Sequence, residues 1–245
     1  MSLAERRADP APSLARRVSG RDWAQVEASL DERGAAVLPG LLDPAECAGL
    51  AGRYADDSAF RSRVVMARHG FGRGEYKYFG YPLPAIVAAL RENLYPRLAP
   101  IANRWNAALR IGVHYPDTLA AWLERCHCSG QTKPTPLLLH YQAGDYNCLH
   151  QDLYGEHVFP IQATVLLSDP RDFTGAEFVL TEQRPRMQSR AEVVTLAQGD
   201  AVLFAVNYRP MQGARGFHRV TMRHGVSRLT SGERFTLGVI FHDAR

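Results

Sequence analysis

The chain has 245 residues, of which 46% are apolar and 22% charged, as in an ordinary globular protein. No apolar run approaches the ~20 residues of a membrane span, and four cysteines are too few for a disulfide framework, so we exclude both classes and expect a cytoplasmic protein. The net charge of +4 is carried almost entirely by arginine, which fits a dicarboxylate, a phosphate backbone or an acidic peptide equally well.

The N-terminal half has the signals of helices. Residues 1–20 carry Arg, Pro, Ala and Ser without an apolar face, which predicts a disordered tail. Asp22 can cap a helix that runs to Arg33 and ends at Gly34. Residues 35–38 have the pattern of a short strand, and the sequence Asp43-Pro44 is a second helix start.

Two further helices are expected before the pattern changes. Apolar residues from 83 to 109 keep helical spacing, although Pro96 and Pro100 predict a kink or a break. Another helix is expected from Thr118 to His127, with Asp117 as its cap. We therefore predict that residues 21–134 form a mostly helical support and a lid.

After Pro136 the sequence consists of short apolar runs separated by turn signals. This pattern predicts a mainly β fold with an α-helical N-terminal part: an antiparallel sandwich or jelly roll with helices packed on one sheet. Residues 21–245 are expected to form one domain, with its β core over 135–245. The expected strands are 137–142, 161–167, 176–180, 192–196, 201–206, 235–241 and one near Val220.

The run His150-Gln151-Asp152 is the strongest chemical signal. Residues i and i+2 on a strand or its exit loop point to one side, so His150 and Asp152 can hold one ion together. His224 follows 72 residues after Asp152, and Arg234 follows ten residues after His224. Two imidazoles and one carboxylate leave positions open on a non-haem Fe(II) ion. A His-x-Asp pair alone is common in surface turns, but the downstream pattern favours a metal site.

Two alternatives stay open within this motif. His218 also precedes a strand-like segment and competes with His224 as the third ligand, although the spacing to Arg234 favours His224. Arg234 could instead form a surface ion pair with Glu233 or Glu177.

Several motifs together resemble one superfamily. They are Tyr141 with Gly144-Asp145-Tyr146, His150-Gln151-Asp152, the run from Gly199 to Phe204, and the run from His224 to Thr236. The segment 137–241 resembles the double-stranded β-helix (cupin-like) core of 2-oxoglutarate/Fe(II) dioxygenases. Residues 34–47 resemble the start of the prolyl-hydroxylase-like branch. The full length is similar to a bacterial group described as candidates for oxidative demethylation of damaged DNA.

The resemblance implies a ligand set and a reaction. It makes His150, Asp152 and His224 the ligands of Fe(II). It also implies that Arg234 binds the distal carboxylate of 2-oxoglutarate, helped by Thr236 and Tyr141. The expected enzyme consumes 2-oxoglutarate and O₂, hydroxylates a C–H bond, and releases succinate and CO₂. A non-catalytic metal-binding sensor of the same fold is the alternative from another class.

The primary substrate stays open between a nucleic acid base, a peptide side chain such as proline, and a small metabolite. Residues 68–81 interleave basic and aromatic side chains with glycines, as expected either for a lid that stacks on a base or for a packed β-hairpin. The arginines between 209 and 228 could form a positive rim or a solvated loop. The substrate-side candidates are Arg68, Phe71, Arg73, Tyr76, Tyr78, Asn147 and His218.

Overall fold

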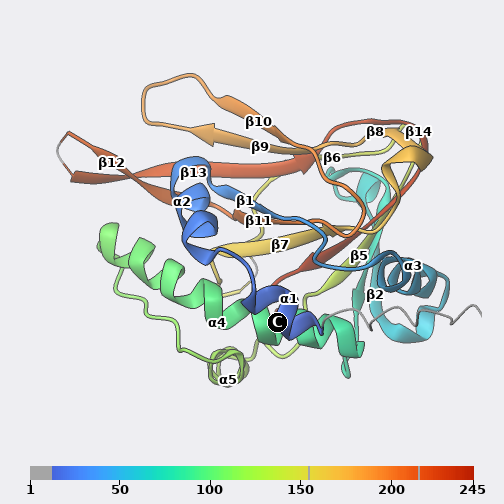
Figure 1. The fold of residues 1–245 in the computed structure, drawn as a ribbon, viewed down its shortest axis with the longest axis horizontal. Coiled ribbons are helices and arrows are strands. Elements are labelled where there is room, and N and C mark those ends of the chain that lie inside the picture. Colours follow the sequence, from blue (N-terminus) through green and yellow to red (C-terminus); the bar gives the residue numbers. More distant parts are fainter. Residues whose placement is uncertain (1–12, 154, 215) are drawn as a thin grey trace, which may run out of the picture.

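Two antiparallel sheets form the framework of the computed structural model, which describes residues 13–153, 155–214 and 216–245 (Figure 1). Within these residues the larger sheet has eight strands. Their order is β1 (Ala35–Leu38), β11 (Ala201–Ala205), β7 (Ile161–Leu166), β14 (Leu229–Val239), β5 (Leu137–Gln142), β4 (Glu75–Phe79) and β2 (Phe60–Val65), with β8 (Phe173–Gly175) beside β14. The smaller sheet has the order β10 (Arg190–Val194), β9 (Phe178–Gln183), β13 (Gly216–Val226), β6 (Tyr146–His150) and β3 (Gly72–Arg73), with β12 (Tyr208–Gly213) beside β13.

Side chains of the larger sheet alternate between two buried layers. On one face, Val165, Leu203 and Leu237 pack with the helices in the main core. On the other face, Leu166 and Phe204 point between the two sheets, because successive residues of a strand face opposite ways. The expected jelly roll with helices on one sheet is therefore confirmed.

The helices begin and end where local chemistry favours it. The Asp22 side chain accepts a hydrogen bond from the Gln25 amide, and Gly34 adopts a left-handed φ of 75° at the C-terminal end, as the sequence predicts. Asp43 and Glu46 form a complete capping box. The α-helices are α1 (Leu14–Ser19), α2 (Trp23–Arg33), α3 (Pro44–Gly52), α4 (Ala85–Ala108) and α5 (Leu119–Cys128), and the 3₁₀ turns are η1 (Arg53–Ala55), η2 (Asp57–Ala59), η3 (Met66–Arg68) and η4 (Pro170–Asp172).

The expected break of one helix and the expected cap of another are wrong. Helix α4 is not split at Pro96 and Pro100, because the burial of its apolar face, including Leu94, Leu98 and Trp105, compensates for the missing backbone donors. Helix α5 is capped by Thr118, not by Asp117. None of the helices in the described part of the chain combines the length and apolarity of a membrane-spanning segment.

The N-terminal half contributes more to the sheets than expected. Strands β2 and β4 extend the larger sheet through the pairing of β4 with β5, although more of residues 21–134 is helix than strand. The predicted tail is wrong for residues 13–20, since α1 buries Leu14 and Val18 in the helical core; residues 1–12 lie outside the described residues. Strands β6, β8 and β12 were also not anticipated. The β9 strand begins two residues later than expected.

Candidate metal and cosubstrate site

A cavity of about 300 Å³ lies between the two sheets. Strands β4, β5, β7, β11 and β14 line one side, and β6, β9 and β13 line the other. Most of its wall is apolar or aromatic. The polar side chains that reach it therefore stand out, since a buried polar group needs a partner.

Three of these polar side chains meet at one end of the cavity. Strand β6 ends at His150, which lies opposite His224 of β13, and Asp152 follows two residues after His150. One donor atom of each residue lies within 4.8 Å of the other two, and no other group of three such side chains was found in the described part of the chain. The Asp152 carboxylate lies between the imidazoles, 3.4 Å from Nε2 of each.

The surrounding contacts orient these three side chains. Nδ1 of His150 lies 2.7 Å from the Cys148 carbonyl oxygen, which leaves Nε2 to face Asp152. The His224 ring packs against Phe204, with 4.6 Å between ring centroids, and against Phe178. The Gln151 amide donates to the carbonyls of Asn207 and Met222 and so anchors the loop between the two ligand residues.

In the metal-free protein the electrostatics favour the metal-binding protonation state at Asp152 and His224, but not at His150. Burial opposes ionisation of Asp152, but hydrogen bonds from His150 and His224 outweigh it and hold the pKa of Asp152 well below its usual value. Burial lowers the pKa of His224, while at His150 the Asp152 carboxylate outweighs burial and raises the pKa. An ionised carboxylate and a neutral imidazole are the metal-binding forms.

These residues fit a divalent ion with open positions. Donor atoms about 2.1 Å from one ion and at right angles to each other are about 3 Å apart. The observed separation of 3.4 Å on each side of Asp152 is close to that value. Two imidazoles and one carboxylate are the donor set of non-haem Fe(II) sites.

A second polar group lies deeper in the cavity, where Arg234 of β14 pairs with Tyr141 of β5. Arg234 is 2% exposed, and its Nε and Nη1 have no hydrogen-bond partner within the described residues. Burial lowers the pKa of Arg234 to about 10. The Tyr141 hydroxyl is also buried without a partner, and Thr236 lines the cavity next to them.

The alternative of a surface ion pair for Arg234 is wrong. Glu233 contacts His140, 2.5 Å from its Nε2, and Glu177 accepts a hydrogen bond from Ser227. The guanidinium points into the cavity instead, with Tyr141 and Phe173 flanking it at 5.8 and 5.9 Å from their ring centroids.

Comparison with known proteins places the chain in a family. A family model described as "oxygenase, catalysing oxidative methylation of damaged DNA" matches residues 74–244, more than half of the chain. The chain belongs to this oxygenase family. Two uncharacterized proteins from strains of Mycobacterium tuberculosis are 45% identical to the oxygenase over 199 residues, which cover 79% of this chain and 85% of each relative.

Solved structures share the fold of the oxygenase at low identity. A prolyl-4-hydroxylase of Pseudomonas putida is 14% identical with a TM-score of 0.51, covering 91% of this chain and 99% of that one. A 2-oxoglutarate/Fe(II) oxygenase of Burkholderia pseudomallei is 18% identical with a TM-score of 0.50, covering 91% and 93%. At this identity the likeness establishes the jelly-roll fold alone, and with the family match it confirms the resemblance seen in the sequence.

Only some substrate-side candidates of the oxygenase reach the cavity. Those that line it are Phe71, Tyr76, Tyr78 and Asn147. Arg68 and Arg73 are exposed outside it, and Arg73 lies 3.9 Å from Asp145. Residues 75–79 form strand β4, which favours the packed hairpin over a lid for that part of the segment.

His218 is not part of the site. It shares a strand face with His224, but six residues of β13 separate them, which is roughly 20 Å. The buried side chains of Val220 and Met222 lie between them. His218 pairs instead with Met211 in the β12–β13 hairpin, and it does not line the cavity.

The basic zone after residue 209 is not one surface. Arg209 is fully buried, donates to the Glu182 carboxylate and to the Asp31 carbonyl, and cannot contribute to a rim. Arg219 stacks on Tyr208, and Arg223 and Arg228 are exposed. Arg215 lies outside the described residues.

The sequence interpretation missed Gln162 and the two phenylalanines that flank His224. Gln162 lies on β7, is almost fully buried, and lines the cavity. A signal was available, because a glutamine on the same strand face as Thr164 interrupts the apolar run Ile161–Leu166. Phe178 and Phe204 carry no such signal, because buried aromatic residues are common in strands.

Proposed function

We propose that this oxygenase uses Fe(II) and 2-oxoglutarate to hydroxylate a C–H bond of its substrate. The observation that supports this most directly is one cavity that holds both a His-Asp-His cluster and a buried guanidinium without a partner. Family membership supports an enzyme rather than a non-catalytic sensor.

In this proposal His150, Asp152 and His224 hold Fe(II) on one face of the ion. With 2-oxoglutarate and O₂, the bound iron would supply the oxidising chemistry: one oxygen atom enters the substrate as a hydroxyl, and the other enters succinate as CO₂ is released. Phe178 and Phe204 fix the ring of His224 by packing, and Gln151 fixes the loop that carries Asp152. The protein thereby holds its ligands in place before the ion arrives.

Arg234, Tyr141 and Thr236 bind the distal carboxylate of 2-oxoglutarate in this proposal. A buried guanidinium without an anion is unfavourable, and two of its nitrogens are available for a carboxylate. The Tyr141 hydroxyl stays protonated because burial raises the pKa of Tyr141, so it can donate to the same carboxylate. The apolar walls around these groups exclude water and strengthen the ionic interaction.

For the primary substrate we propose an alkylated nucleic acid base. The family description names damaged DNA, and hydroxylation of an N-methyl carbon gives an unstable hemiaminal that releases formaldehyde, so such a site removes methyl groups. Phe71, 47% exposed at the cavity and stacked on His69, offers a surface for a base. The nearby exposed Arg68 and Arg73 can meet phosphates.

The first test is an anaerobic titration of the protein with Fe(II) and 2-oxoglutarate, followed by visible absorbance. Chelation of the keto acid by Fe(II) should give a weak charge-transfer band that saturates at one equivalent of each. Bound iron without the band would contradict the cosubstrate assignment.

The substrate is tested separately by a screen. Methylated single-stranded DNA and RNA should stimulate succinate release and yield formaldehyde in equal amounts. Stimulation by a proline-containing peptide or a small metabolite instead would replace the nucleobase with that substrate class.

A further inference from the structure

A third unpaired polar group lies in the cavity, away from Arg234. The Gln162 side chain on β7 is 3% exposed and lines the cavity, and its Nε2 has no hydrogen-bond partner in the described chain. Buried amide groups are nearly always paired in folded proteins. A buried, unpaired amide on a residue that lines a binding cavity therefore indicates a ligand atom that it contacts.

The strand register places Gln162 at the metal end of the cavity. Gln162 lies directly opposite Phe204 in the β7–β11 pairing, so both side chains point to the same face. The Phe204 ring packs against the His224 ring at 4.6 Å. One aromatic side chain thus links Gln162 to the metal cluster.

The same register places Arg234 at the opposite end. Gly238 of β14 lies opposite Thr164 of β7. Arg234 is four residues before Gly238 on β14, and Gln162 is two residues before Thr164 on the antiparallel strand β7, so the two lie on opposite sides of this pair. Six residue steps, roughly 20 Å of sheet, therefore separate the backbones of Arg234 and Gln162. The unpaired donors form two groups, one at each end of the cavity.

We propose that Gln162 donates a hydrogen bond from Nε2 to the metal-side carboxylate of the bound 2-oxoacid and thereby positions that end of the cosubstrate. This inference rests on the proposed function. A dicarboxylate has one acceptor group at each end, and the two donor groups of the cavity match that arrangement: Arg234 with Tyr141 at the distal end, and Gln162 beside the metal. Gln162 is then a positioning residue for the oxoacid that does not ligate the ion.

Two oxoacids distinguish the two ends of the cavity. 2-Oxoglutarate has both carboxylates, whereas 2-oxobutyrate has only the metal-side carboxylate and the keto group. Dissociation constants for both are measured from the charge-transfer band of the anaerobic Fe(II) protein, in wild type, Gln162→Met and Arg234→Met. We expect Gln162→Met to lower the affinity for both acids by a similar factor of about 10, the effect of one hydrogen bond to a charged group. Arg234→Met should lower the affinity for 2-oxoglutarate alone.

Stability and iron binding provide the controls. Methionine has nearly the shape of glutamine, and the amide has no partner to lose, so Gln162→Met should unfold at the same temperature or higher and should bind Fe(II) alone as wild type does. Gln162→Glu has the same shape as glutamine but a negative charge, so it should lower the affinity for both acids further. It serves as the second variant if Gln162→Met does not fold.

The outcomes separate this inference from the proposed function. Equal affinity of wild type and Gln162→Met for both acids would overturn the role of Gln162 and leave the proposed function intact. Weakening of 2-oxoglutarate alone would also overturn it, because the amide would then act at the distal end. A wild-type protein without any band would overturn both.

Discussion

Two buried regions of this oxygenase each hold an arginine, and they differ in how the arginine is satisfied. On the helix side of the larger sheet, Arg91 is 1% exposed and donates from Nη2 to Asp243 at 3.0 Å and from Nη1 to the Tyr81 hydroxyl at 3.2 Å. Between the sheets, Arg234 is equally buried, yet its Nε and Nη1 find no partner among the described residues. Arg91 has a buried carboxylate partner although its Nε is unpaired, whereas Arg234 has no acidic partner among the described residues.

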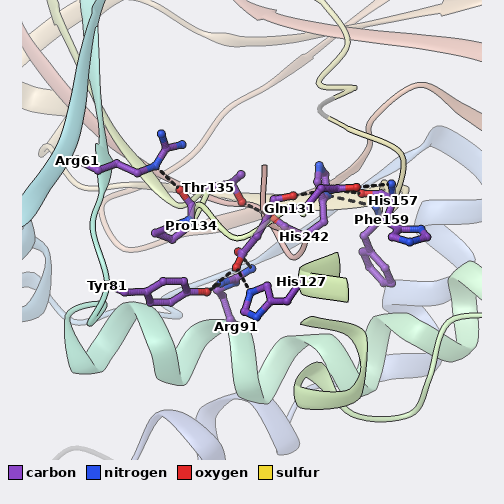
Figure 2. A network of polar contacts seen from close by, with 11 residues as sticks. Arg61, Tyr81, Arg91, His127, Gln131, Pro134, Thr135, His157, Phe159 and His242 are labelled. Carbon is purple, nitrogen blue, oxygen red and sulfur yellow. Dashed lines mark hydrogen bonds and ion pairs between the residues drawn. The ribbon is translucent and has the colours of Figure 1, made fainter. Parts of the chain in front are cut away.

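Figure 2 shows how extensive the helix-side network is. The Asp243 carboxylate also accepts from Tyr81 at 2.8 Å and lies 2.8 Å from Nε2 of His127. Gln131 accepts from the His157 amide and donates to the Asp243 carbonyl, so the network joins the end of the chain to α4 and α5. A buried charge with this many partners has a structural role, while a buried charge without an anion marks a binding site.

Removal of a metal ligand should give the largest effect. Asp152→Ala deletes the carboxylate that lies between the two imidazoles, so we expect no Fe(II) binding above background and no turnover. Metal content after anaerobic Fe(II) loading and desalting measures this directly. His218→Ala is the control and should load iron as wild type does, since it lies outside the cavity; loss of iron in that variant would contradict the ligand assignment.

Arg91→Met should give the next largest effect, on stability. It leaves the Asp243 carboxylate buried without its cation, and we expect the free energy of unfolding to fall by about 3–5 kcal/mol. Urea denaturation of the ligand-free protein measures this change. A loss below about 1 kcal/mol would mean that Tyr81 and His127 satisfy the carboxylate by themselves.

Arg234→Met, unlike Arg91→Met, should lower ligand affinity and not stability. The ligand-free protein loses no hydrogen bond to Nε or Nη1, so its free energy of unfolding should be unchanged or higher by up to about 2 kcal/mol. Its affinity for 2-oxoglutarate should fall by about 100-fold, because a charge-assisted contact in a dry cavity is lost. Titration of the charge-transfer band measures the affinity. A destabilised variant with normal affinity would make Arg234 a structural residue like Arg91.

The smallest effect is a pH dependence of stability in the helix-side network. Burial lowers the pKa of His242 to about 4, from about 6.5 for an exposed histidine. Between these values the unfolded chain binds more protons than the folded one, so stability should fall as the pH falls, by up to about 1.4 kcal/mol per pH unit. Thermal unfolding of wild type and His242→Asn, at pH 7 and pH 5, tests this. Equal slopes in the two proteins would exclude His242 as the cause.

Much of the site could be predicted from the sequence because its signals are local or follow strand periodicity. The close spacing of His150, at the end of β6, and Asp152, in its exit loop, brings both to one cavity. The ten-residue interval from His224 to Arg234 spans the short connection from β13 in one sheet to β14 in the other, and both side chains line the same cavity. Caps at Asp22 and Asp43 were predicted for the same reason, since their hydrogen bonds join residues three apart.

The parts that were missed depend on contacts between distant residues. The sequence does not distinguish Arg209 from the exposed arginines near it. It is buried because it donates to Glu182 and to the Asp31 carbonyl, which lie far from it in the sequence. The spacing to Arg234 favours His224 over His218, and the length of β13 then places His218 outside the cavity. Gln162 lines the cavity beside Phe204 through a strand register that the sequence does not reveal.

The sequence by itself determined the jelly-roll class, the cluster of His150, Asp152 and His224, and the place of Arg234 in the same cavity, because motif spacing is a property of the chain. Only the tertiary structure decided which buried polar groups are satisfied within the protein. That distinction separates Arg91 from Arg234 and identifies Gln162. It depends on which side chains meet across the core, and strand pairing between residues far apart in the sequence determines those meetings.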